Sequence, residues 1–415
     1  MAKLKTLSDL KGKLTGKVVL CRVDLNVPMV SGRIEDATRI RKIIPTIKEL
    51  IKQNARVVVL SHFGRPDGKF EREMSLAPLT NHLSEALDGL EVKFALDCIG
   101  DATKESVKNL KNGEVLLLEN LRFHAGEEAN NPKFVEELAS LGDFYVNDTF
   151  SCSHRKHASI VGIAKKLPSA AGLLMQDEIE NLERILSNPQ KPMAAIVGGS
   201  KVSTKLKLLN TLVKKVDLLV IGGAMANTFL KAAGYKIGKS LHEEDLVDTA
   251  AQIMEKARKY NCEIFLPVDV VVAEKFQAMA ECRILPANKI PAASMVLDIG
   301  PLSIATLTEK LSKCKTVVWN GPLGAFECRP FDVATISLAR TVASLTTSGS
   351  LTSIAGGGDV VAALNVAGLT ESFTYISTAG GAFLDWLQGD GLPGIDVLKE
   401  IDQAEFSIGS LAVAK

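Results

Sequence analysis

Short runs of β-branched and aliphatic residues recur along the chain, and each ends abruptly in glycine or polar residues. They cover residues 17–23, 56–60, 114–118, 144–146, 193–197, 218–221, 263–266, 316–319 and 351–355. Amphipathic stretches with helical periodicity lie between them, at residues 36–53, 133–141, 201–215 and 243–260. Apolar strands that alternate with helices are typical of parallel sheets covered on both faces. The pattern therefore predicts an α/β protein.

The number of predicted strands is too large for one ordinary sheet. The length of 415 residues favours two or three domains at about 150 residues each. A polar helical pattern at residues 175–186 lies between Leu167-Pro168 and Asn188-Pro189, which indicates a join near residues 170–190. We therefore expect two α/β domains with parallel sheets.

Composition and charge exclude several classes of protein. Apolar residues make up 46% and charged residues 23% of the chain, which excludes a disordered or fibrous protein. The net charge of +1 argues against a nucleic-acid-binding surface that covers the whole molecule. The seven cysteines form no C-x-x-C pair, which excludes a zinc knuckle and favours reduced thiols. Without a signal-like start or a run of about 18 apolar residues, we expect a soluble, cytoplasmic protein with no membrane partner.

Basic residues gather where the predicted strands of the first half end. Ligands of open parallel sheets bind beyond the carboxyl ends of the strands. Those ends, with the start of the following helix, carry Asp24, Asn26, Arg39, His62, Arg65, Arg122, His154 and Arg155. Converging guanidinium groups suit a small ligand with several negative charges. The alternative is that each arginine is a solvated surface charge or an ion-pair partner, and that the histidines are structural.

The second half carries glycines and lysines at the corresponding places. Gly198-Gly199-Ser200-Lys201 follows a predicted strand and is expected to open a helix, where backbone N–H groups can bind a phosphate. Lys201 and Lys205 would then share one face of the first helical turn, where like charges repel and cations oppose the helix dipole. A bound anion would compensate for both effects.

Further strand ends of the second half supply more candidate ligand groups. They carry Gly223, Asp269, Asn320, Glu327, and Gly356-Gly357-Gly358-Asp359. The carboxylate of Asp359 stands at the start of a helical pattern, where it could hold a Mg²⁺ ion or simply cap the helix. The G-x-G-x-x-G pattern of dinucleotide-binding sites is absent from the sequence.

Eight segments together resemble the phosphoglycerate kinase family, in the family's order, over roughly residues 5–400. They are RVDLNVP (22–28), SHFGRP (61–66), LLENLRF (117–123), VND followed by HRKH (146–148 and 154–157), VGGSKVSTK (197–205), WNGPLGAFE (319–327), AGGGD (355–359) and STAGGA (377–382). The resemblance implies reversible phosphoryl transfer between 1,3-bisphosphoglycerate and MgADP, which gives 3-phosphoglycerate and MgATP. It also implies a mostly monomeric enzyme of glycolysis and gluconeogenesis.

The family's organisation implies two Rossmann-like domains with parallel sheets, and it implies their boundaries in this chain. Residues 1–170 would bind 3-phosphoglycerate, 171–188 would form an interdomain helix, and 189–392 would bind the nucleotide. Residues 393–415 would return to the N-terminal domain. The active site would lie in the cleft between the domains and would work by hinge closure.

The resemblance also assigns roles to individual residues. Asp24 and Asn26 would contact the carboxyl and hydroxyl end of the triose. Arg39, His62, Arg65, Arg122 and Arg155, with His154 alongside, would form a basic patch for its phosphate groups. The nucleotide site would comprise Gly199, Lys205, Gly223, Asn320, Glu327, Gly356, Gly357, Gly358, Asp359 and Val360, with Glu327 at the ribose and Asp359 at the Mg²⁺ ion. Arg39 and Lys201 would meet the transferring phosphoryl group.

The chain departs from the family pattern at several positions. Val360 replaces a Thr or Ser, which removes a side-chain hydroxyl, while Ala379 and Ala334 replace glycines. Ser151-Cys152-Ser153 replaces the usual Gly-Thr-Ala, and residues 404–415 extend beyond the expected end. The intact basic patch and lysines favour an active kinase. The alternatives are a dehydrogenase, a two-lobed anion-binding protein, and a kinase-like protein recruited to another role.

Overall fold

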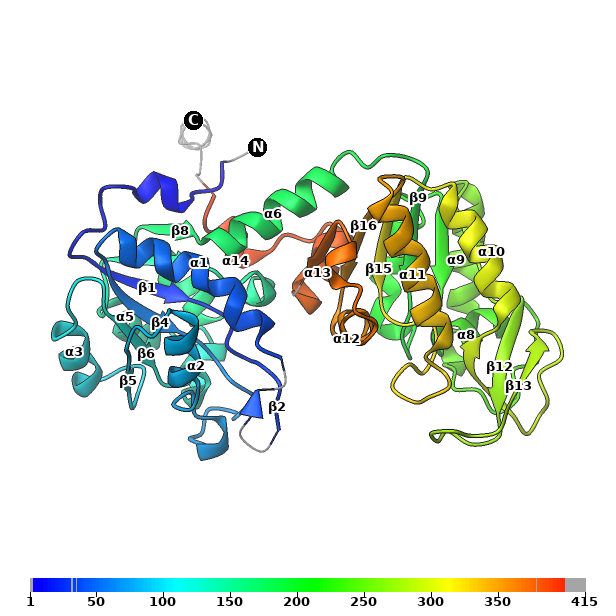
Figure 1. Ribbon diagram of the computed structural model, residues 1–415, viewed down its shortest axis with the longest axis horizontal. Helices are drawn as coiled ribbons and strands as arrows, with labels where there is room; N and C mark the ends of the chain where they lie inside the picture. The colour runs from blue at the N-terminus through cyan, green and yellow to red at the C-terminus, as the bar shows by residue number, and fades with distance from the viewer. Residues whose placement is uncertain (1–2, 31–32, 35, 378, 400–415) are drawn as a thin grey trace, which may run out of the picture. The chain divides into compact units, whose positions relative to one another are not determined.

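The computed structural model describes residues 3–30, 33–34, 36–377 and 379–399. The chain divides into two compact units. Unit 1 comprises Met1–Glu180 and Gly391–Lys415, and unit 2 comprises Asn181–Asp390. Each unit is built around its own six-stranded sheet (Figure 1).

The sheet of unit 1 is entirely parallel, with the strand order β5-β6-β4-β1-β7-β8. Its strands are β1 (Val18–Arg22), β4 (Arg56–Leu60), β5 (Val92–Ala95), β6 (Val115–Leu118), β7 (Phe144–Asn147) and β8 (Ser169–Ala171). A short antiparallel pair joins β2 (Met29–Val30) to β3 (Arg33–Ile34). Every residue of the central strand β1 is buried, as expected for a strand covered on both faces.

The helices of unit 1 bury apolar residues, except for the four-residue α4, which buries Glu127. They are α1 (Thr38–Lys52), α2 (Leu79–Ala86), α3 (Asp101–Lys108), α4 (Ala125–Glu128) and α5 (Pro132–Ala139). In α1, Ile40, Ile43, Ile47 and Leu50 follow helical spacing and pack into the same core as strand residues of β1 and β4. This packing fixes the start of α1, and with it Arg39, relative to the ends of the strands.

The sheet of unit 2 is also entirely parallel, with the order β11-β10-β9-β15-β16-β17. Its strands are β9 (Met193–Val197), β10 (Leu218–Ile221), β11 (Glu263–Phe265), β15 (Thr316–Asn320), β16 (Thr352–Gly356) and β17 (Tyr375–Ser377). Its helices are α7 (Leu206–Leu212), α8 (Met225–Ala232), α9 (Val247–Lys259), α10 (Pro301–Ser312), α11 (Val333–Thr347), α12 (Gly358–Ala367) and α13 (Gly380–Gln388). Helices α10 and α11 lie side by side (Figure 1).

Unit 2 also contains a three-stranded antiparallel sheet that the hydrophobic pattern did not predict. It consists of β12 (Asp269–Ala273), β13 (Cys282–Pro286) and β14 (Met295–Ile299). No residue of β13 is fully buried, so this strand shows no apolar run. Asp269, which the sequence placed at the end of a strand, begins β12, and its carboxylate accepts the backbone N–H groups of Leu302 and Ser303. Asp269 therefore has a structural role, because its carboxylate caps the first turn of α10.

Helix α6 (Leu173–Leu186) connects the two units, because the division falls after Glu180. The chain re-enters unit 1 at Gly391 and forms α14 (Pro393–Asp396). There the backbone N–H of Lys5 donates to the Leu398 carbonyl at 3.0 Å. Residues 400–415, including the extension at 404–415, lie outside the described residues. No helix in the described part of the chain is long and apolar enough to cross a membrane.

The structure confirms the predicted fold class of two parallel-sheet α/β domains. One local prediction is wrong. Lys201 and Lys205 do not share the first turn of an α-helix, because Lys201 lies before a short 3₁₀ turn and α7 begins only at Leu206. The glycines and the turn occupy the residues that the helical pattern had included.

Candidate functional site

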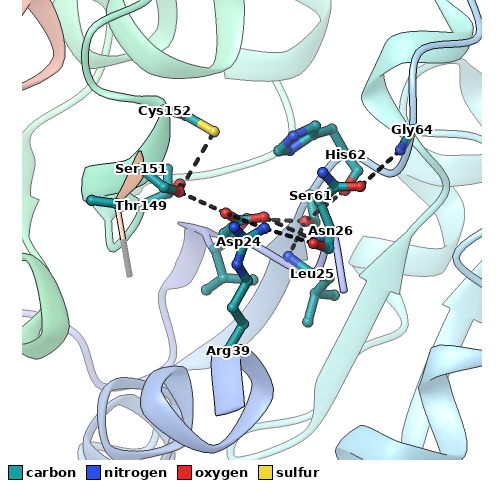
Figure 2. A network of polar contacts seen from close by, with 12 residues as sticks. Asp24, Leu25, Asn26, Arg39, Ser61, His62, Gly64, Thr149, Ser151 and Cys152 are labelled. Carbon is teal, nitrogen blue, oxygen red and sulfur yellow. Dashed lines mark hydrogen bonds and ion pairs between the residues drawn. The ribbon is translucent and has the colours of Figure 1, made fainter. Parts of the chain in front are cut away.

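The carboxylate of Asp24 lies at the centre of a polar network in unit 1 (Figure 2). Its Oδ2 accepts the hydroxyl of Ser151 at 2.6 Å and lies 3.2 Å from Nη1 of Arg39. Its Oδ1 accepts the backbone N–H of Asn26 at 3.0 Å. Burial acts to raise the pKa of Asp24, but the charge of Arg39 and these hydrogen bonds hold it below its ordinary value. Asp24 is therefore a fixed anion that orients Arg39.

Arg39 and Asn26 are held by further contacts from the same elements. Nη1 of Arg39 also donates to the carbonyl of Asn26 at 2.6 Å, although the side chain stays about one-third exposed. The side-chain oxygen of Asn26 accepts the N–H of Gly64 at 3.0 Å. The loops after β1 and β4 are thus tied together, and the guanidinium of Arg39 keeps donors available for a ligand.

Arg22 lies behind the predicted patch and fixes His62. Arg22 is 1% exposed, and its Nη2 lies 3.0 Å from Nδ1 of His62. A guanidinium only donates, so this Nδ1 accepts and the ring proton of neutral His62 is on Nε2. Burial and the charge of Arg22 hold the pKa of His62 well below its ordinary value. His62 therefore offers a neutral N–H donor.

Arg122 and Arg155 add positive charge to the same region. Arg122 is buried, and it donates to the Gly64 carbonyl at 2.8 Å and pairs with Glu128 at 3.1 Å. Nε of Arg155 lies 3.3 Å from Nε2 of His154. Burial and the neighbouring charge of Arg155 lower the pKa of Arg122. This mutual destabilisation of cations would be relieved by a bound anion.

Buried groups behind the patch balance part of its charge. Glu127 is fully buried and accepts the N–H and hydroxyl of Ser159, whose hydroxyl also accepts Nε of Arg22 at 3.0 Å. Burial, Arg122 and Arg155 lower the pKa of His157 to about 3, so this ring is neutral. Unit 1 thus contains a preorganised set of donors that suits a small, multiply charged anion.

The predicted residues of unit 1 do not all join this cluster equally. Arg65 is exposed, although the neighbouring Gly64 is held through both its N–H and its carbonyl. The others, Asp24, Asn26, Arg39, His62, Arg122, His154 and Arg155, are linked by the contacts or charge interactions described above. The structure therefore brings together seven of the eight residues that the strand ends suggested.

In unit 2, loops that contain glycines lie very close together where the strands end. A Cβ on Gly198 would lie 1.8 Å from the Pro322 carbonyl oxygen, and one on Gly223 would lie 2.6 Å from the Gly199 carbonyl oxygen. Gly357 has a φ of +109°, and its Cβ would lie 2.6 Å from Nδ2 of Asn320. The loops after β9, β10, β15 and β16 therefore approach each other at positions that leave no room for a Cβ. The N–H groups of Gly198 and Gly223 donate to the carbonyls of Asn320 and Leu323, which ties these loops together.

Lys205 holds two of these loops together. Its Nζ donates to the Gly198 carbonyl at 2.5 Å and to Oδ1 of Asn320 at 2.6 Å. Burial lowers the pKa of Lys205 to about 8, while Asp359 acts in the opposite direction. Asn320 donates in turn to the Gly356 carbonyl at 2.6 Å. Lys201, by contrast, is exposed and lies outside this network of loops.

The glycine run 356–358 leads into α12 as the sequence predicted. Gly358 and Asp359 are exposed in its first turn, with open space around the Cα of Gly358. The side chain of Val360 is fully buried and packs in the core of unit 2. Only its backbone N–H faces the open helix end. The departures Ala334 and Ala379 are also buried.

A cavity of about 540 Å³ adjoins these loops within unit 2. Gly199, Gly223, Glu327 and Asp359 line it together with a larger set of apolar side chains. Glu327 is exposed at its edge. An apolar hollow beside glycine loops fits a ligand with a flat base and a phosphate chain. We refer to it below as the unit 2 cavity.

The family model of phosphoglycerate kinase matches residues 7–390. The chain belongs to the phosphoglycerate kinase family. It is 56% identical over 396 residues to a phosphoglycerate kinase of Sinorhizobium medicae, covering 95% of this chain and 99% of that one. It is also 56% identical over 399 residues to the phosphoglycerate kinase of Xanthobacter flavus, covering 96% and 100%.

Solved structures of the phosphoglycerate kinase family have the same fold. The phosphoglycerate kinase of Coxiella burnetii matches with a TM-score of 0.84 and 43% identity, covering 95% of this chain and 99% of that one. That of Pyrococcus horikoshii matches with a TM-score of 0.83 and 32% identity, covering 97% and 100%. Membership in this family removes the dehydrogenase and the anion-binding protein as alternative families.

Sequence reasoning missed three residues that shape the unit 1 site. Arg22 stands at a strand end, but nothing in the local sequence shows that it is buried beneath the basic patch and contacts His62. Ser151 stood only as a departure from the family pattern, yet it contacts Asp24. Glu127 lies in an ordinary acidic stretch, and nothing in the sequence marks it as buried.

Proposed function

We propose that this chain catalyses reversible phosphoryl transfer between 1,3-bisphosphoglycerate and MgADP, giving 3-phosphoglycerate and MgATP. Its place is then in glycolysis and gluconeogenesis, in the cytoplasm, as a monomer. The observation that carries the proposal is the preorganised cluster around Asp24, Arg39 and His62, which suits a triose carrying several negative charges. The family membership supplies the identity of that triose.

In unit 1, the cationic groups would bind the phosphate groups of the triose, since Arg122 and Arg155 destabilise each other's charge without an anion. His62 would donate through Nε2. Asn26 and Asp24 would lie at the carboxyl and hydroxyl end. Arg65 would reach the ligand from the loop that Gly64 fixes. His154 would act beside Arg155.

In unit 2, the glycine loops would bind the phosphates of the nucleotide. Gly199, Gly223 and residues 356–358 supply close backbone approach, while Lys205 and Asn320 hold the loops in place. Glu327 would bind the ribose at the edge of the cavity. The exposed carboxylate of Asp359 fits Mg²⁺, which prefers one or two carboxylates together with phosphate oxygens. The bound Mg²⁺ would neutralise charge on the nucleotide phosphates.

The chemistry needs no general base, because both nucleophiles, a phosphate oxygen and a carboxylate, are already anionic. Catalysis then depends on positioning and on neutralising the charge of the transferring group. We assign these roles to Arg39, which Asp24 orients, and to Lys201, whose exposure leaves its ammonium available. The reaction requires the two ligands to meet, so hinge closure would complete the site and exclude water.

The decisive experiment measures MgATP-dependent phosphorylation of 3-phosphoglycerate in a coupled assay. Wild type should turn over, and Lys201→Ala should lower kcat by about 10²-fold or more, since its charge acts on the transition state. Lys313→Ala is the matched control, because this exposed lysine of unit 2 forms an ion pair with exposed Glu309 on α10. Absence of turnover by folded wild type would reject the proposal and favour a recruited role. An unchanged kcat of Lys201→Ala would reject only the assignment of Lys201.

A further inference from the structure

Ser151 reaches the polar network of unit 1 from the loop after β7 (Figure 2). It lies in a short 3₁₀ turn, Phe150–Cys152, whereas Asp24 and Asn26 follow β1 and Arg39 stands in the first turn of α1. Strands β1 and β7 are neighbours in the sheet. The hydroxyl of Ser151 therefore ties the ends of two adjacent strands together through the carboxylate of Asp24.

The partners of the Ser151 hydroxyl fix the direction of its proton. The pKa of Asp24 lies below its ordinary value, so its Oδ2 is an ionised acceptor and Ser151 donates to it at 2.6 Å. A hydroxyl has one proton, so Ser151 accepts from the hydroxyl of Thr149, which lies 3.3 Å away. Thr149 is buried, and its backbone N–H donates to the side chain of Asn147 at the end of β7. The Ser151 hydroxyl thus has one favoured orientation.

Two neutral donors reach the two oxygens of the Asp24 carboxylate. The N–H of Asn26 donates to Oδ1 at 3.0 Å, and the hydroxyl of Ser151 donates to Oδ2. The torsion that turns a carboxylate is broad, so such contacts decide the plane of the group. Nη1 of Arg39 then lies 3.2 Å from the same Oδ2 and donates to the Asn26 carbonyl. These contacts use one of the three guanidinium nitrogens.

We propose that Ser151 is a positioning residue: its hydroxyl fixes the carboxylate of Asp24 so that Arg39 presents its remaining N–H groups to the transferring phosphoryl group. This inference rests on the proposed function, since it concerns the residue assigned to that group. Without the hydroxyl, the guanidinium is free to bind both carboxylate oxygens in the two-pronged geometry that it favours, which withdraws donors from the ligand. Ser151 acts through Asp24 and takes no part in the chemical step.

Ser151→Ala removes the hydroxyl and is the first test. The kcat for MgATP-dependent phosphorylation of 3-phosphoglycerate should fall about tenfold, because misplacement of a charge that acts on the transition state is costly. The KM for MgATP should stay within about twofold, since the proposed nucleotide site lies in unit 2. The KM for 3-phosphoglycerate should rise by a smaller factor than kcat falls, because the other cations of unit 1 remain in place.

A double-mutant cycle with Asp24→Ala separates positioning from a general disturbance of the fold. In Asp24→Ala the hydroxyl has no carboxylate to orient, so the further change Ser151→Ala should lower the remaining kcat by less than about twofold. A loss through packing or folding would instead lower kcat by the same factor in both backgrounds. Urea unfolding of each variant gives the folded fraction to which kcat is normalised.

Ser153→Ala is the matched control, because it removes a hydroxyl two residues further along the same loop. The hydroxyl of Ser153 is buried and donates to the carbonyl of Thr149 at 3.0 Å. Its loss disturbs the loop but leaves the contact between Ser151 and Asp24 in place. The kcat of the folded variant should therefore stay within about twofold of wild type.

The possible results distinguish this inference from the proposed function. If wild type turns over and Ser151→Ala keeps its kcat, Ser151 has no positioning role and the inference is overturned. An equal factor of loss with and without Asp24 overturns it as well, since the hydroxyl would then not act through that carboxylate. If folded wild type does not phosphorylate 3-phosphoglycerate, the proposed function fails, and this inference fails with it.

Discussion

Arg22 shows how one buried charge can organise a surface that binds ligands. It joins His62 at 3.0 Å, the Ser159 hydroxyl at 3.0 Å and, through that hydroxyl, the buried carboxylate of Glu127. The loss of one partner from a buried charge network leaves the other charge uncompensated. The same loss also frees the ring of His62 to change tautomer. Stability and ligand binding therefore depend on the same side chain.

We predict that Arg22→Met lowers the free energy of unfolding by about 3 kcal/mol, since Glu127 then stays buried without its cation. The KM for 3-phosphoglycerate should rise, because Nε2 of His62 no longer reliably donates. Urea unfolding and steady-state kinetics measure the two effects. Arg56→Met is a control, as Arg56 lies at the opposite end of neighbouring β4. Wild-type stability of Arg22→Met would show that the buried carboxylate of Glu127 does not need the charge of Arg22.

The pKa of His157 leads to a prediction for the pH dependence of stability. Its pKa is about 3 in the folded protein and about 6.5 in the unfolded chain, because burial and the surrounding arginines disfavour its charge. Between these values the unfolded chain binds the proton and the folded protein does not, so stability is lost as the pH falls below about 6.5. Burial raises the pKa of Asp298 to about 8 and that of Asp148 to about 6, which acts in the opposite direction. The expected observation is therefore a difference between two proteins: from pH 7.5 to pH 5, His157 lowers the midpoint of urea unfolding of wild type relative to that of His157→Gln.

His157→Gln should lack this contribution, since glutamine does not titrate, so its stability relative to wild type should rise as the pH falls from 7.5 to 5. His62, whose pKa is lowered for similar reasons, contributes equally in both proteins. The same change of the midpoint with pH in both proteins would mean that His157 is charged in the folded protein. The side-chain contact with Glu127 at 3.7 Å would then be an ion pair.

At the scale of the residue, the sequence showed which residues could carry the chemistry. It did not show how deeply each side chain is buried. Arginines and histidines at strand ends can be recognised because parallel strands bring their carboxyl ends to one edge. The depth of a side chain depends on contacts from distant segments. Arg22 is covered by residues more than 100 positions away, such as Cys152 and Ser159. No local pattern carries that information.

At the scale of the element, two glycine substitutions can distinguish the close approach of the glycine loops in unit 2 from the strain of a left-handed backbone. Gly223→Ala should abolish most nucleotide binding, because its Cβ would lie 2.6 Å from the Gly199 carbonyl oxygen. Gly368→Ala is a matched control: its φ is 66°, close to the 65° of Gly223, but open space surrounds it. Both variants should lose about 1 kcal/mol of stability from the left-handed backbone, and Gly223→Ala should lose more because its Cβ also clashes with the Gly199 backbone.

Only Gly223→Ala should weaken the binding of ADP, measured by calorimetry. Equal ADP affinities in the two variants would mean that the loops can separate without cost. The proposed phosphate site would then not depend on their close approach.

The elements that could be predicted are those with a strong hydrophobic pattern. The fully buried strands, such as β9 and β10, have the limits that their apolar runs indicated. The exposed strand β13 has no such run. The helix after β9 begins only at Leu206, after a 3₁₀ turn that ends at Lys205, whose ammonium donates to the Gly198 carbonyl. Tertiary contacts decide these cases, so periodicity could not reveal them.

At the scale of the whole molecule, helix α6 is the element that both units share. Its first turn is anchored in unit 1. The N–H of Met175 donates to Oδ1 of Asp148 at 3.0 Å, and the N–H of Leu173 donates to the hydroxyl of Thr46 at 2.9 Å. A Cβ on Gly172 would lie 2.2 Å from Oδ1 of Asp148, so this position leaves no room for a side chain. Asp148 thus fixes where the connecting helix starts.

We predict that Asp148→Ala separates ligand binding from turnover. Loss of a helix-capping carboxylate costs about 1 kcal/mol and loosens the first turn of α6. Asp148 touches neither proposed half-site, so the dissociation constants of ADP and 3-phosphoglycerate, measured one at a time, should stay within about twofold of wild type. Phosphoryl transfer requires both ligands to meet in one geometry, and kcat should fall about tenfold because misplacement of reactants is costly. An unchanged kcat would show that the anchoring of α6 does not govern closure, whereas weakened binding of 3-phosphoglycerate alone would place the effect within unit 1.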